Sequence, residues 1–254
     1  MKENYFIRKI SKNDIERFVQ IFRESFKSEY LIPSIYRGVG IEKFIELELS
    51  NPFSLYHYFG FYYDDTIIGC AEFKIINNDT FFLNLIASDN QYMGKGIGSA
   101  LVNYAFKFFT NKGCSKVQLD VYEDNDIALN WYNSLGFIEL NKKSIYKLDN
   151  ALLEEEEEEY SIYILNFPQY WKLIDTFGFY YIEVAIDDTT IRLGVINNDL
   201  IIRGEFNQYS RLASKYILKV MNFNCIYYVG DCDRDETELT FMNNILRMEL
   251  NLKG

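Results

Sequence analysis

Residues 92–101, Tyr-Met-Gly-Lys-Gly-Ile-Gly-Ser-Ala-Leu, constrain the fold most, because three glycines at alternate positions separate an apolar strand pattern from an amphipathic helix pattern. Glycine lets the backbone turn sharply and approach a ligand closely. The N–H groups that open a helix have no partner within it, so they attract phosphate oxygens. The stretch predicts a strand, a tight turn and a helix whose start binds an anion. Glycine turns also end ordinary strands, so the flanking chain has to support this interpretation.

The composition and charge of the chain exclude several classes of protein. Its 254 residues are 48% apolar, which is enough for one large domain or two small ones. The sequence has no apolar run of the roughly 20 residues that cross a bilayer, and its start lacks the apolar stretch of a signal peptide. We therefore expect a cytoplasmic protein without a membrane partner. The net charge of −11 argues against nucleic acid as a partner, because nucleic acid binding needs basic patches.

The cysteines and the single histidine predict no metal site and no disulfide. The four cysteines have neither the spacing of zinc ligands nor that of a redox pair. His57 lies in an aromatic run and is expected to pack in the core. A Ser-His-Asp type of catalysis is not predicted.

Hydrophobic periodicity predicts a mixed α/β domain over residues 1–150, with helices on both faces of a sheet. Strands are expected at 5–10, 55–63, 66–75, 80–88, 117–121, 137–140 and 144–148. Helices are expected at about 15–26, 41–49, 97–112 and 126–135.

Two motifs in this order of elements resemble the GNAT superfamily, the acetyl-CoA-dependent N-acetyltransferases. One is the glycine turn, Gly94 to Gly98, which follows the central strand. The other is residues 125–137, which have the family pattern of Asn, then Ala three residues on, then Tyr, then Gly-Phe. The resemblance covers about residues 1–150. It implies a GNAT-type mixed sheet, acetyl-CoA as cofactor and direct transfer of an acetyl group to a primary amine of a small molecule or peptide.

The resemblance assigns donor binding to the glycine turn and to the strand before it. Backbone N–H groups of the turn would hold the diphosphate, with Gly96 and Gly98 where a Cβ would most obstruct it. The strand that ends at Ser88 would splay from its neighbour near Val121, so that its backbone binds the pantetheine arm and polarises the thioester. The predicted cofactor-binding residues are Ile86, Ala87, Ser88, Met93, Gly94, Lys95, Gly96, Ile97, Gly98, Ser99, Asn125 and Tyr132. Met93 replaces the usual Gln or Arg, and Lys95 is equally well interpreted as a solvated loop lysine.

The resemblance also makes Tyr132 the general acid that protonates the departing thiolate, the alternative being a buried aromatic residue. Asn84 stands where many relatives carry a glutamate, and an amide cannot act as a base. We expect Glu72 on the preceding strand to take the role of the base. Asp120 and Glu123 are the next candidates, although each of the three also fits an ordinary structural carboxylate. This substitution keeps a second class open, a non-catalytic acyl-CoA-binding or regulatory protein that retains the fold.

Residues 151–159 are predicted to be an acidic linker, and residues 160–254 a second, smaller α/β domain. Its strands are expected at 160–165, 180–186, 191–196, 200–206 and 225–229, and its helix at 208–221. Counted from the sequence, residues 151–254 carry a net charge of −9 and residues 1–150 carry −2. This asymmetry favours a cationic small molecule or a polyamine as the acceptor, while a peptide N-terminus or a protein lysine stays equally open.

A shift of 111 residues relates the two parts of the chain and suggests a degenerate second copy of the same fold. It lays Glu72 on Glu183 and places the three glycines of the turn on Glu205, Asn207 and Tyr209. These side chains would obstruct a phosphate, so we expect one donor site per chain. The second copy is expected either to complete the acceptor pocket or to form the interface of a homodimer.

Overall fold

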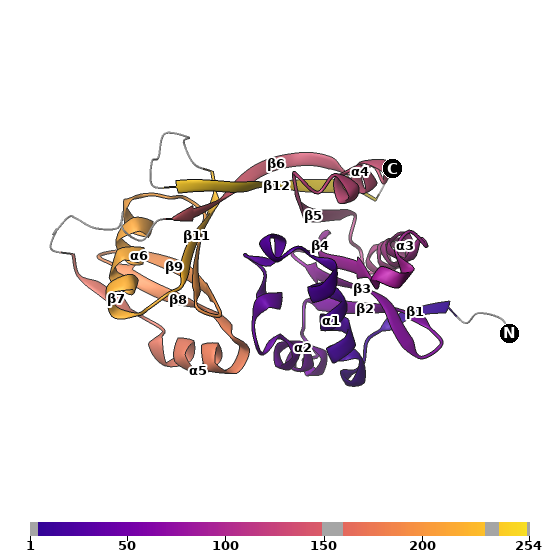
Figure 1. Ribbon diagram of the computed structural model, residues 1–254, viewed down its shortest axis with the longest axis horizontal. Coiled ribbons are helices and arrows are strands. Elements are labelled where there is room, and N and C mark those ends of the chain that lie inside the picture. Colours follow the sequence, from indigo (N-terminus) through magenta and orange to yellow (C-terminus); the bar gives the residue numbers. More distant parts are fainter. Residues whose placement is uncertain (1–4, 149–159, 232–238, 253–254) are drawn as a thin grey trace.

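The computed structural model describes residues 5–148, 160–231 and 239–252, which form two lobes joined by one continuous sheet (Figure 1). The predicted acidic linker, 151–159, lies outside the described residues. The twelve strands follow the order β1-β2-β3-β4-β5-β12-β6-β11-β10-β9-β8-β7. They are β1 (Tyr5–Lys9), β2 (Tyr56–Tyr63), β3 (Thr66–Ile75), β4 (Thr80–Ser88), β5 (Lys116–Tyr122), β6 (Ile138–Leu148), β7 (Ile162–Ile164), β8 (Phe179–Ile186), β9 (Thr189–Ile196), β10 (Asp199–Arg203), β11 (Cys225–Gly230) and β12 (Leu239–Asn251).

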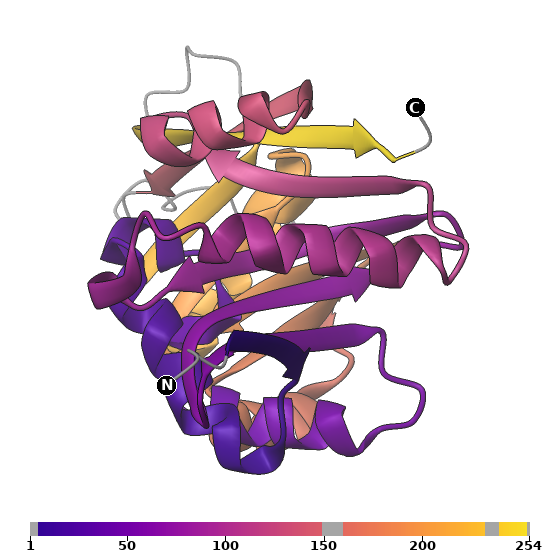
Figure 2. The same ribbon diagram turned by 90° about the vertical axis from the view of Figure 1, so that its right-hand side faces the viewer.

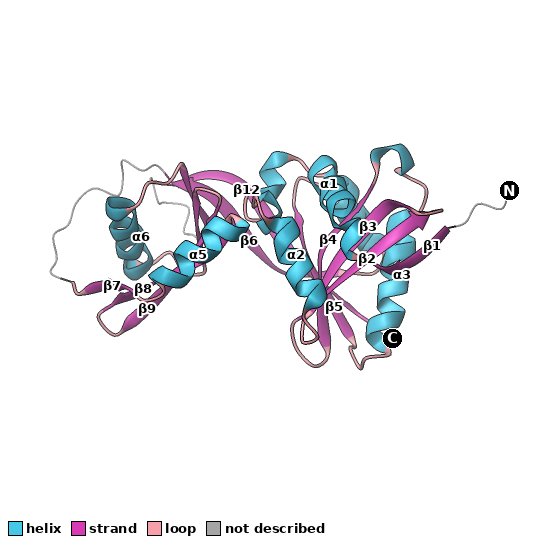
Figure 3. Cartoon of the chain, turned by 90° about the horizontal axis from the view of Figure 1, so that it is seen from below, coloured by secondary structure: helices cyan, strands magenta, loops and turns pink. Residues whose placement is uncertain are grey.

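The helices divide between the two lobes. The first lobe contains α1 (Ile15–Ser25), α2 (Ile41–Ser50), α3 (Ile97–Thr110) and α4 (Asp126–Ser134), and the second contains α5 (Phe167–Phe177) and α6 (Gln208–Val220). Seen from below, α2 and α5 face each other between the lobes, while α3 and α6 lie at the two outer sides (Figure 3). No helix of the described chain has the length and apolar character needed to cross a membrane.

The last strand of the chain belongs to the sheet of the first lobe. β12 lies between β5 and β6, pairing Leu246 with Val121 on one side and with Lys142 on the other. β6 in turn pairs through its far edge with β11 of the second lobe. The sheet of the first lobe therefore includes β12 from the end of the chain, and the sheet of the second lobe continues into β6 from the first part of the chain.

The two lobes also share an apolar core on the inner face of the first lobe. This inner core holds Phe18, Phe22 and Tyr36, which lie on or beside α1. Six buried residues of the second lobe join it: Phe177, Phe179, Ile196, Ile201, Tyr227 and Val229. The helices approach closely where the Gly40 amide donates to the Phe177 carbonyl over 2.9 Å, and a Cβ on Gly40 would lie 2.2 Å from the Thr176 carbonyl oxygen.

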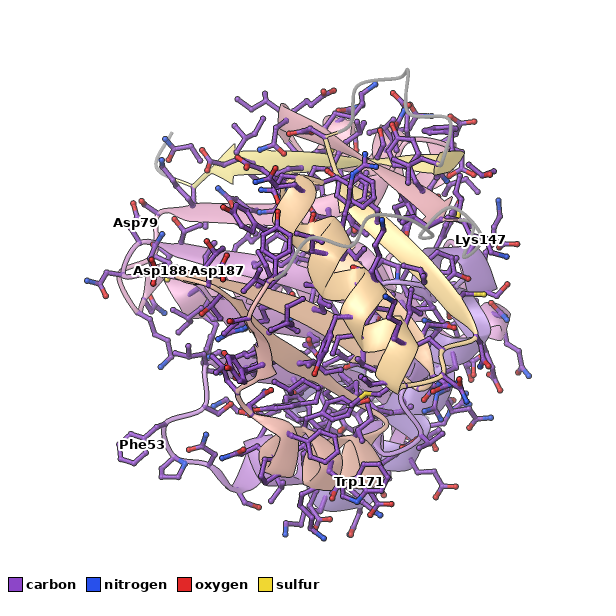
Figure 4. The ribbon with its side chains drawn as sticks, turned by 90° about the vertical axis from the view of Figure 1, so that its left-hand side faces the viewer. Phe53, Asp79, Lys147, Trp171, Asp187 and Asp188 are labelled. Carbon is purple, nitrogen blue, oxygen red and sulfur yellow. The ribbon has the colours of Figure 1, made fainter. Side chains whose placement is uncertain are left out.

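A second core lies on the outer face of the first lobe. α3 crosses the strands on the side away from the second lobe (Figure 2). Its residues Leu101, Val102 and Ala105 pack there with Val121 of β5 and Tyr132 of α4. The second lobe has its own core under α6, which lies in front of that lobe's strands in Figure 4.

Three elements differ from the sequence-based prediction. The strands expected at 137–140 and 144–148 form the single strand β6, because β12 pairs with it from Ile138 to Leu148 and β11 pairs with the other edge of its last five residues. α5 was not predicted, although Pro168 in its first turn and the left-handed Gly178 after its last residue are typical helix boundaries. β12 was not predicted either, because both its partners lie about a hundred or more residues away in sequence.

The second lobe repeats the order of the first. The series β8, β9, β10, α6, β11 matches β2, β3, β4, α3, β5, and the pairs β10–β11 and β4–β5 are both parallel. The 111-residue shift fits the two helices, whose first residues are Ile97 and Gln208. It is wrong for the strands before the helix, because Glu72 lies on β3 whereas Glu183 lies on β8, the counterpart of β2. The connection into the helix is shorter in the second lobe, which changes the offset.

Candidate active site

The glycine turn forms an open start to α3. Gly94 and Gly96 have φ angles of 75° and 77°, a left-handed conformation that other residues adopt only with strain. A Cβ at either position would meet nothing within 4 Å, so the space beside the turn is free of described protein atoms. No side chain caps the helix at Gly96. The turn therefore leaves room and donors for an anion at the N-terminus of α3.

The corresponding helix of the second lobe is closed by its own side chain. Asn207 is the N-cap of α6, and its Oδ1 accepts hydrogen bonds from the amides of Tyr209 and Ser210, each over 3.1 Å. An N-cap of this kind satisfies the donors that an anion would otherwise use. The lobes thus differ at equivalent positions, glycine with open amides in one and asparagine with occupied amides in the other.

The other residues of the turn have more ordinary surroundings. A Cβ on Gly98 would lie 3.3 Å from the Trp131 ring, so this glycine makes room for α4. This contact gives Gly98 a role in helix packing. A role of Gly98 in ligand binding stays a prediction. The Lys95 ammonium lies 4.6 Å above the centroid of the Tyr92 ring, and the Met93 side chain is exposed.

β4 and β5 separate beside the turn, where the resemblance predicted it. They pair only from Thr80 with Lys116 to Leu83 with Leu119. A β-bulge follows at Asn84, between the pairs of β4 with Glu72 and Phe73. Beyond it, Ile86, Ala87 and Ser88 pair with β3 on one side and with no strand on the other. This edge of β4 offers backbone groups to an extended ligand, as the free edge of a strand does.

Tyr132 lies in α4 on the outer face of the sheet. It is 7% exposed and packs against Trp131 and Phe137, with ring centroids 4.9 and 5.6 Å away. Burial raises the pKa of its hydroxyl well above the ordinary value, so Tyr132 keeps its proton at neutral pH. The N-cap of this helix is Asn125, whose side-chain oxygen accepts from the Ala128 amide over 3.3 Å. Asn125 thus fixes the start of the helix that carries Tyr132.

Glu72 lies on β3, in contact with the residue that replaces the family glutamate. Its Oε1 accepts from Asn84 Nδ2 and its Oε2 from the Tyr36 hydroxyl, both over 2.5 Å. The residue is 2% exposed. Burial raises its pKa to about 7, although the two hydrogen bonds act in the opposite direction. A carboxylate that titrates near neutral pH suits a general base.

The two other carboxylates considered as bases are engaged elsewhere. Asp120 forms a bidentate pair with Arg247 of β12, at 2.5 and 2.9 Å. Glu123 accepts from Lys142 over 2.6 Å and from Asn244. These contacts favour Glu72 over both.

A cavity of about 270 Å³ opens on the inner side of the sheet, beyond the carboxyl end of β5. Its lining comes from the connection between α1 and α2, from the end of β5 and from β6 and β12, so sequence-distant segments build it together. The lining residues are Lys27, Glu29, Tyr30, Ile32, Tyr122, Asp124, Ile145, Met242 and Asn243.

The second lobe holds the α1–α2 connection that lines this cavity. Arg203 donates to the Pro33 carbonyl over 2.7 Å, and Asn197 Nδ2 donates to the Arg37 carbonyl over 2.9 Å. Arg37 also pairs with the Asp199 carboxylate over 2.7 Å. The same connection carries Tyr36, the partner of Glu72. The second lobe therefore fixes both the cavity wall and the hydrogen bond to the candidate base.

His57 and the metal-binding residue types offer no further chemistry in the described chain. The His57 ring packs against Phe108 and Phe109, with centroids 5.3 and 5.2 Å away, and burial lowers its pKa to about 4. Within residues 5–148, 160–231 and 239–252, no group of three His, Cys, Asp or Glu side chains is placed to hold a metal ion. Of the predicted site, the structure brings together the glycine turn with the free edge of β4, and Glu72 with Asn84.

Known proteins resemble both the first lobe and the whole chain. The model of the acetyltransferase (GNAT) family matches residues 15–137. A spermidine N(1)-acetyltransferase of Thermoplasma acidophilum is 32% identical over 142 residues, which are 52% of this chain and 86% of that protein. N-alpha-acetyltransferase 30 of Saccharomyces cerevisiae is 26% identical over 131 residues, 44% of this chain and 74% of its own.

Two solved structures have the fold of the entire chain. A tandem GNAT protein from the clavulanic acid biosynthesis pathway is 9% identical, with a TM-score of 0.73 and 99% of both chains covered. A protein from Pyrococcus horikoshii, assigned as an acetyltransferase, is 16% identical, with a TM-score of 0.65 and with 97% of this chain and 89% of the other covered. These likenesses agree with a repeat of the GNAT fold in the second lobe. On its sequence and its architecture, the chain belongs to the GNAT family of acetyltransferases, whose acyl donor is acetyl-CoA.

Proposed function

We propose that the chain transfers the acetyl group of acetyl-CoA directly to a primary amine, with the donor at the start of α3 and the acceptor in the cavity beyond the end of β5. The observation that carries this proposal is the contrast between the open start of α3 at Gly96 and the closed start of α6 at Asn207. It supports one donor site per chain. The names of two relatives, a spermidine N(1)-acetyltransferase and an N-alpha-acetyltransferase, support an amine as the acceptor class.

The residues present fit the donor. The uncapped start of α3 at Gly96 suits a diphosphate, and the free edge of β4 from Ile86 to Ser88 suits an extended amide-bearing arm. When bound, acetyl-CoA supplies an acetyl thioester. Asn125 holds the start of α4 in place beside this region.

Tyr132 and Glu72 have complementary protonation states. Tyr132 remains protonated at neutral pH and acts as the proton donor to the leaving sulfur. Glu72, with its pKa of about 7, accepts the proton of the incoming amine. The two belong to different faces of the sheet, Tyr132 to the outer core and the Glu72 partner Tyr36 to the inner core. This arrangement suits a donor and an acceptor that enter from opposite sides of the separated strands.

Replacing Glu72 by glutamine tests the base. For the wild type, the rate of thiol release at saturating acetyl-CoA should rise with pH and bend near pH 7, because the carboxylate must be ionised. The variant should lose roughly a hundredfold in kcat/KM and lose this bend. The substitution preserves the shape of the side chain, and the Tyr36 hydroxyl can reverse to accept from the new amide.

Unfolding measurements supply the structural readout for the same variant. Since the pKa of Glu72 rises from 4.5 to about 7 on folding, the folded wild type binds more protons in this window, and its free energy of unfolding falls as the pH rises through it. The glutamine variant should lose this component. Glu123→Gln, which removes an exposed carboxylate paired with Lys142, is the matched control and should change neither profile. An unchanged bend near pH 7 in the Glu72 variant would remove the base assignment.

A further inference from the structure

We infer that the cavity beyond the end of β5 binds a second ammonium group of the acceptor, so that the substrate is a diamine or polyamine rather than a monoamine. This inference rests on the proposed function for the site of transfer, but it concerns a part of the acceptor that does not react. It is carried by Tyr30, Tyr122 and Asp124, which form one connected unit at the end of β5.

The unit presents an aromatic wall and a carboxylate side by side. The Tyr30 and Tyr122 rings stack with centroids 4.4 Å apart. The Tyr30 hydroxyl donates to Asp124 Oδ1 over 2.9 Å, and Asn243 Nδ2 of β12 donates to the same oxygen over 2.8 Å. Burial alone would raise the pKa of Asp124, but these hydrogen bonds outweigh it and hold the pKa below its ordinary value. Asp124 is therefore ionised and fixed in orientation.

The chain already places an ammonium group at this unit. Lys27 Nζ lies 5.1 Å above the centroid of the Tyr30 ring, within the range of a cation–π contact. Its pKa is raised, first by a hydrogen bond with Tyr30 and also by the charge of Asp124. Lys27 is exposed, so a ligand's ammonium can replace its ammonium at the Tyr30 ring while the lysine side chain moves into solvent. Its ammonium group marks where a ligand's ammonium would bind.

The charges around the cavity favour a cation over an anion. Two carboxylates, Glu29 and Asp124, line it, against the single ammonium of Lys27. The net charge of the whole chain is −11, which raises the local concentration of cationic ligands. An acceptor with a carboxylate would have to approach Asp124 and would depend on Lys27 alone. An acceptor with a distal ammonium replaces Lys27 at the Tyr30 ring.

The position of the cavity fits a two-ended ligand. It lies beyond Tyr122, the last residue of β5, and Asp124 directly precedes Asn125, the N-cap of the helix that carries Tyr132. One wall comes from the connection that also holds Tyr36 against Glu72. The segments that line the cavity are thus continuous along the chain with those that carry the proposed acid and hold the proposed base.

Calorimetry of the full chain with saturating CoA tests the inference, using diaminobutane and n-butylamine as the probes. The two share a chain length and differ in the second ammonium group. Diaminobutane should bind at least about tenfold more tightly than butylamine to the wild type. Asp124→Asn should abolish this difference. Lys27→Ala, which removes the competing ammonium, should tighten diaminobutane binding several-fold.

The control variant is Asp188→Asn, which removes one exposed carboxylate from the turn between β8 and β9, where Figure 4 labels it beside Asp187. It makes the same change of net charge and should retain the wild-type preference. Equal binding of the two amines by the wild type, or weaker diaminobutane binding by Lys27→Ala, would overturn the inference. Acetylation of both amines at equal kcat/KM would sink the diamine subsite and spare the proposed function. Diaminobutane binding without any thiol release would overturn the proposed function and leave the diamine subsite intact.

Discussion

Replacing Tyr132 by phenylalanine should lower kcat for acetyl transfer about a hundredfold and leave the affinity for CoA within about twofold. The hydroxyl is the only group removed, and general acid catalysis contributes factors of roughly 10² to 10⁴. The ring stays packed between Trp131 and Phe137, so the helix should keep its place. Steady-state thiol release gives kcat, and calorimetry with CoA gives the affinity.

Tyr170→Phe is the matched control for this variant. Tyr170 is also a buried helical tyrosine, 6% exposed, and it lies on α5 in the core of the second lobe, apart from both proposed catalytic residues. Its replacement should leave both kcat and CoA affinity unchanged. Equal losses in the two variants would indicate a packing effect, and a wild-type rate for Tyr132→Phe would remove the general acid assignment. The second outcome would mean that another group or water protonates the departing thiolate.

Truncation of the chain after Asn150 should give a fragment that does not fold. The fragment retains all four helices of the first lobe but lacks β12, whose removal leaves the inner edges of both β5 and β6 unpaired. It also loses Leu246 and Met248 from the outer core and the six second-lobe side chains from the inner core. At about 1.5–3 kcal/mol for each buried apolar side chain, this loss is comparable with the 5–15 kcal/mol that stabilises a typical domain.

Thermal melting followed by circular dichroism, with size-exclusion chromatography, measures this effect. The full chain should melt cooperatively, and the truncated chain should show no cooperative transition and should aggregate through its exposed strands. Removal of residues 239–254 alone, which spares the rest of the second lobe, should give the same loss. A truncated chain that melts cooperatively and binds CoA as the full chain does would show that the first lobe folds independently of β12.

The parts of the site that depend on local sequence could be predicted. Gly94 and Gly96 adopt left-handed conformations at the start of a helix, as alternate glycines before an amphipathic pattern suggest. The sequence predicts Glu72 as the general base because Asn84 cannot act as one. The bulge at Asn84 brings the two side chains into contact. Whether either glycine binds a ligand and whether Glu72 is a base remain predictions.

The parts that depend on long-range contacts could not be predicted. Gly98 serves the packing of Trp131, a contact between two helices that no local pattern reveals. β12 pairs with β5 and β6, and β6 pairs with β11 of the second lobe. Predicting this arrangement requires knowing which strands pair, and an alternating pattern fits several partners equally well. The cavity depends on this exchange, since Asn243 of β12 reaches Asp124 only because β12 lies beside β5.

The second lobe holds a segment of the first lobe in position. Its contacts through Arg203, Asn197 and Asp199 hold the α1–α2 connection, and that connection presents Tyr30 to the cavity and Tyr36 to Glu72. A lobe whose own helix start is closed by Asn207 thus still shapes the cavity of the first lobe. This explains physically why a copy without an open donor site would be retained in one chain.

Calorimetric titration of the full chain with CoA, for the wild type, Gly96→Ala and Gly113→Ala, tests the central claim most directly. Both glycines have positive φ, 77° and 96°, and a Cβ on either meets nothing within 4 Å, so both substitutions should cost about 1–2 kcal/mol of stability. They lie at opposite ends of α3. We predict one CoA site per wild-type chain, an affinity at least tenfold weaker in Gly96→Ala and an unchanged affinity in Gly113→Ala. No binding at millimolar CoA, two equivalent sites per chain, or equal weakening by both substitutions would contradict a donor site at the open start of α3.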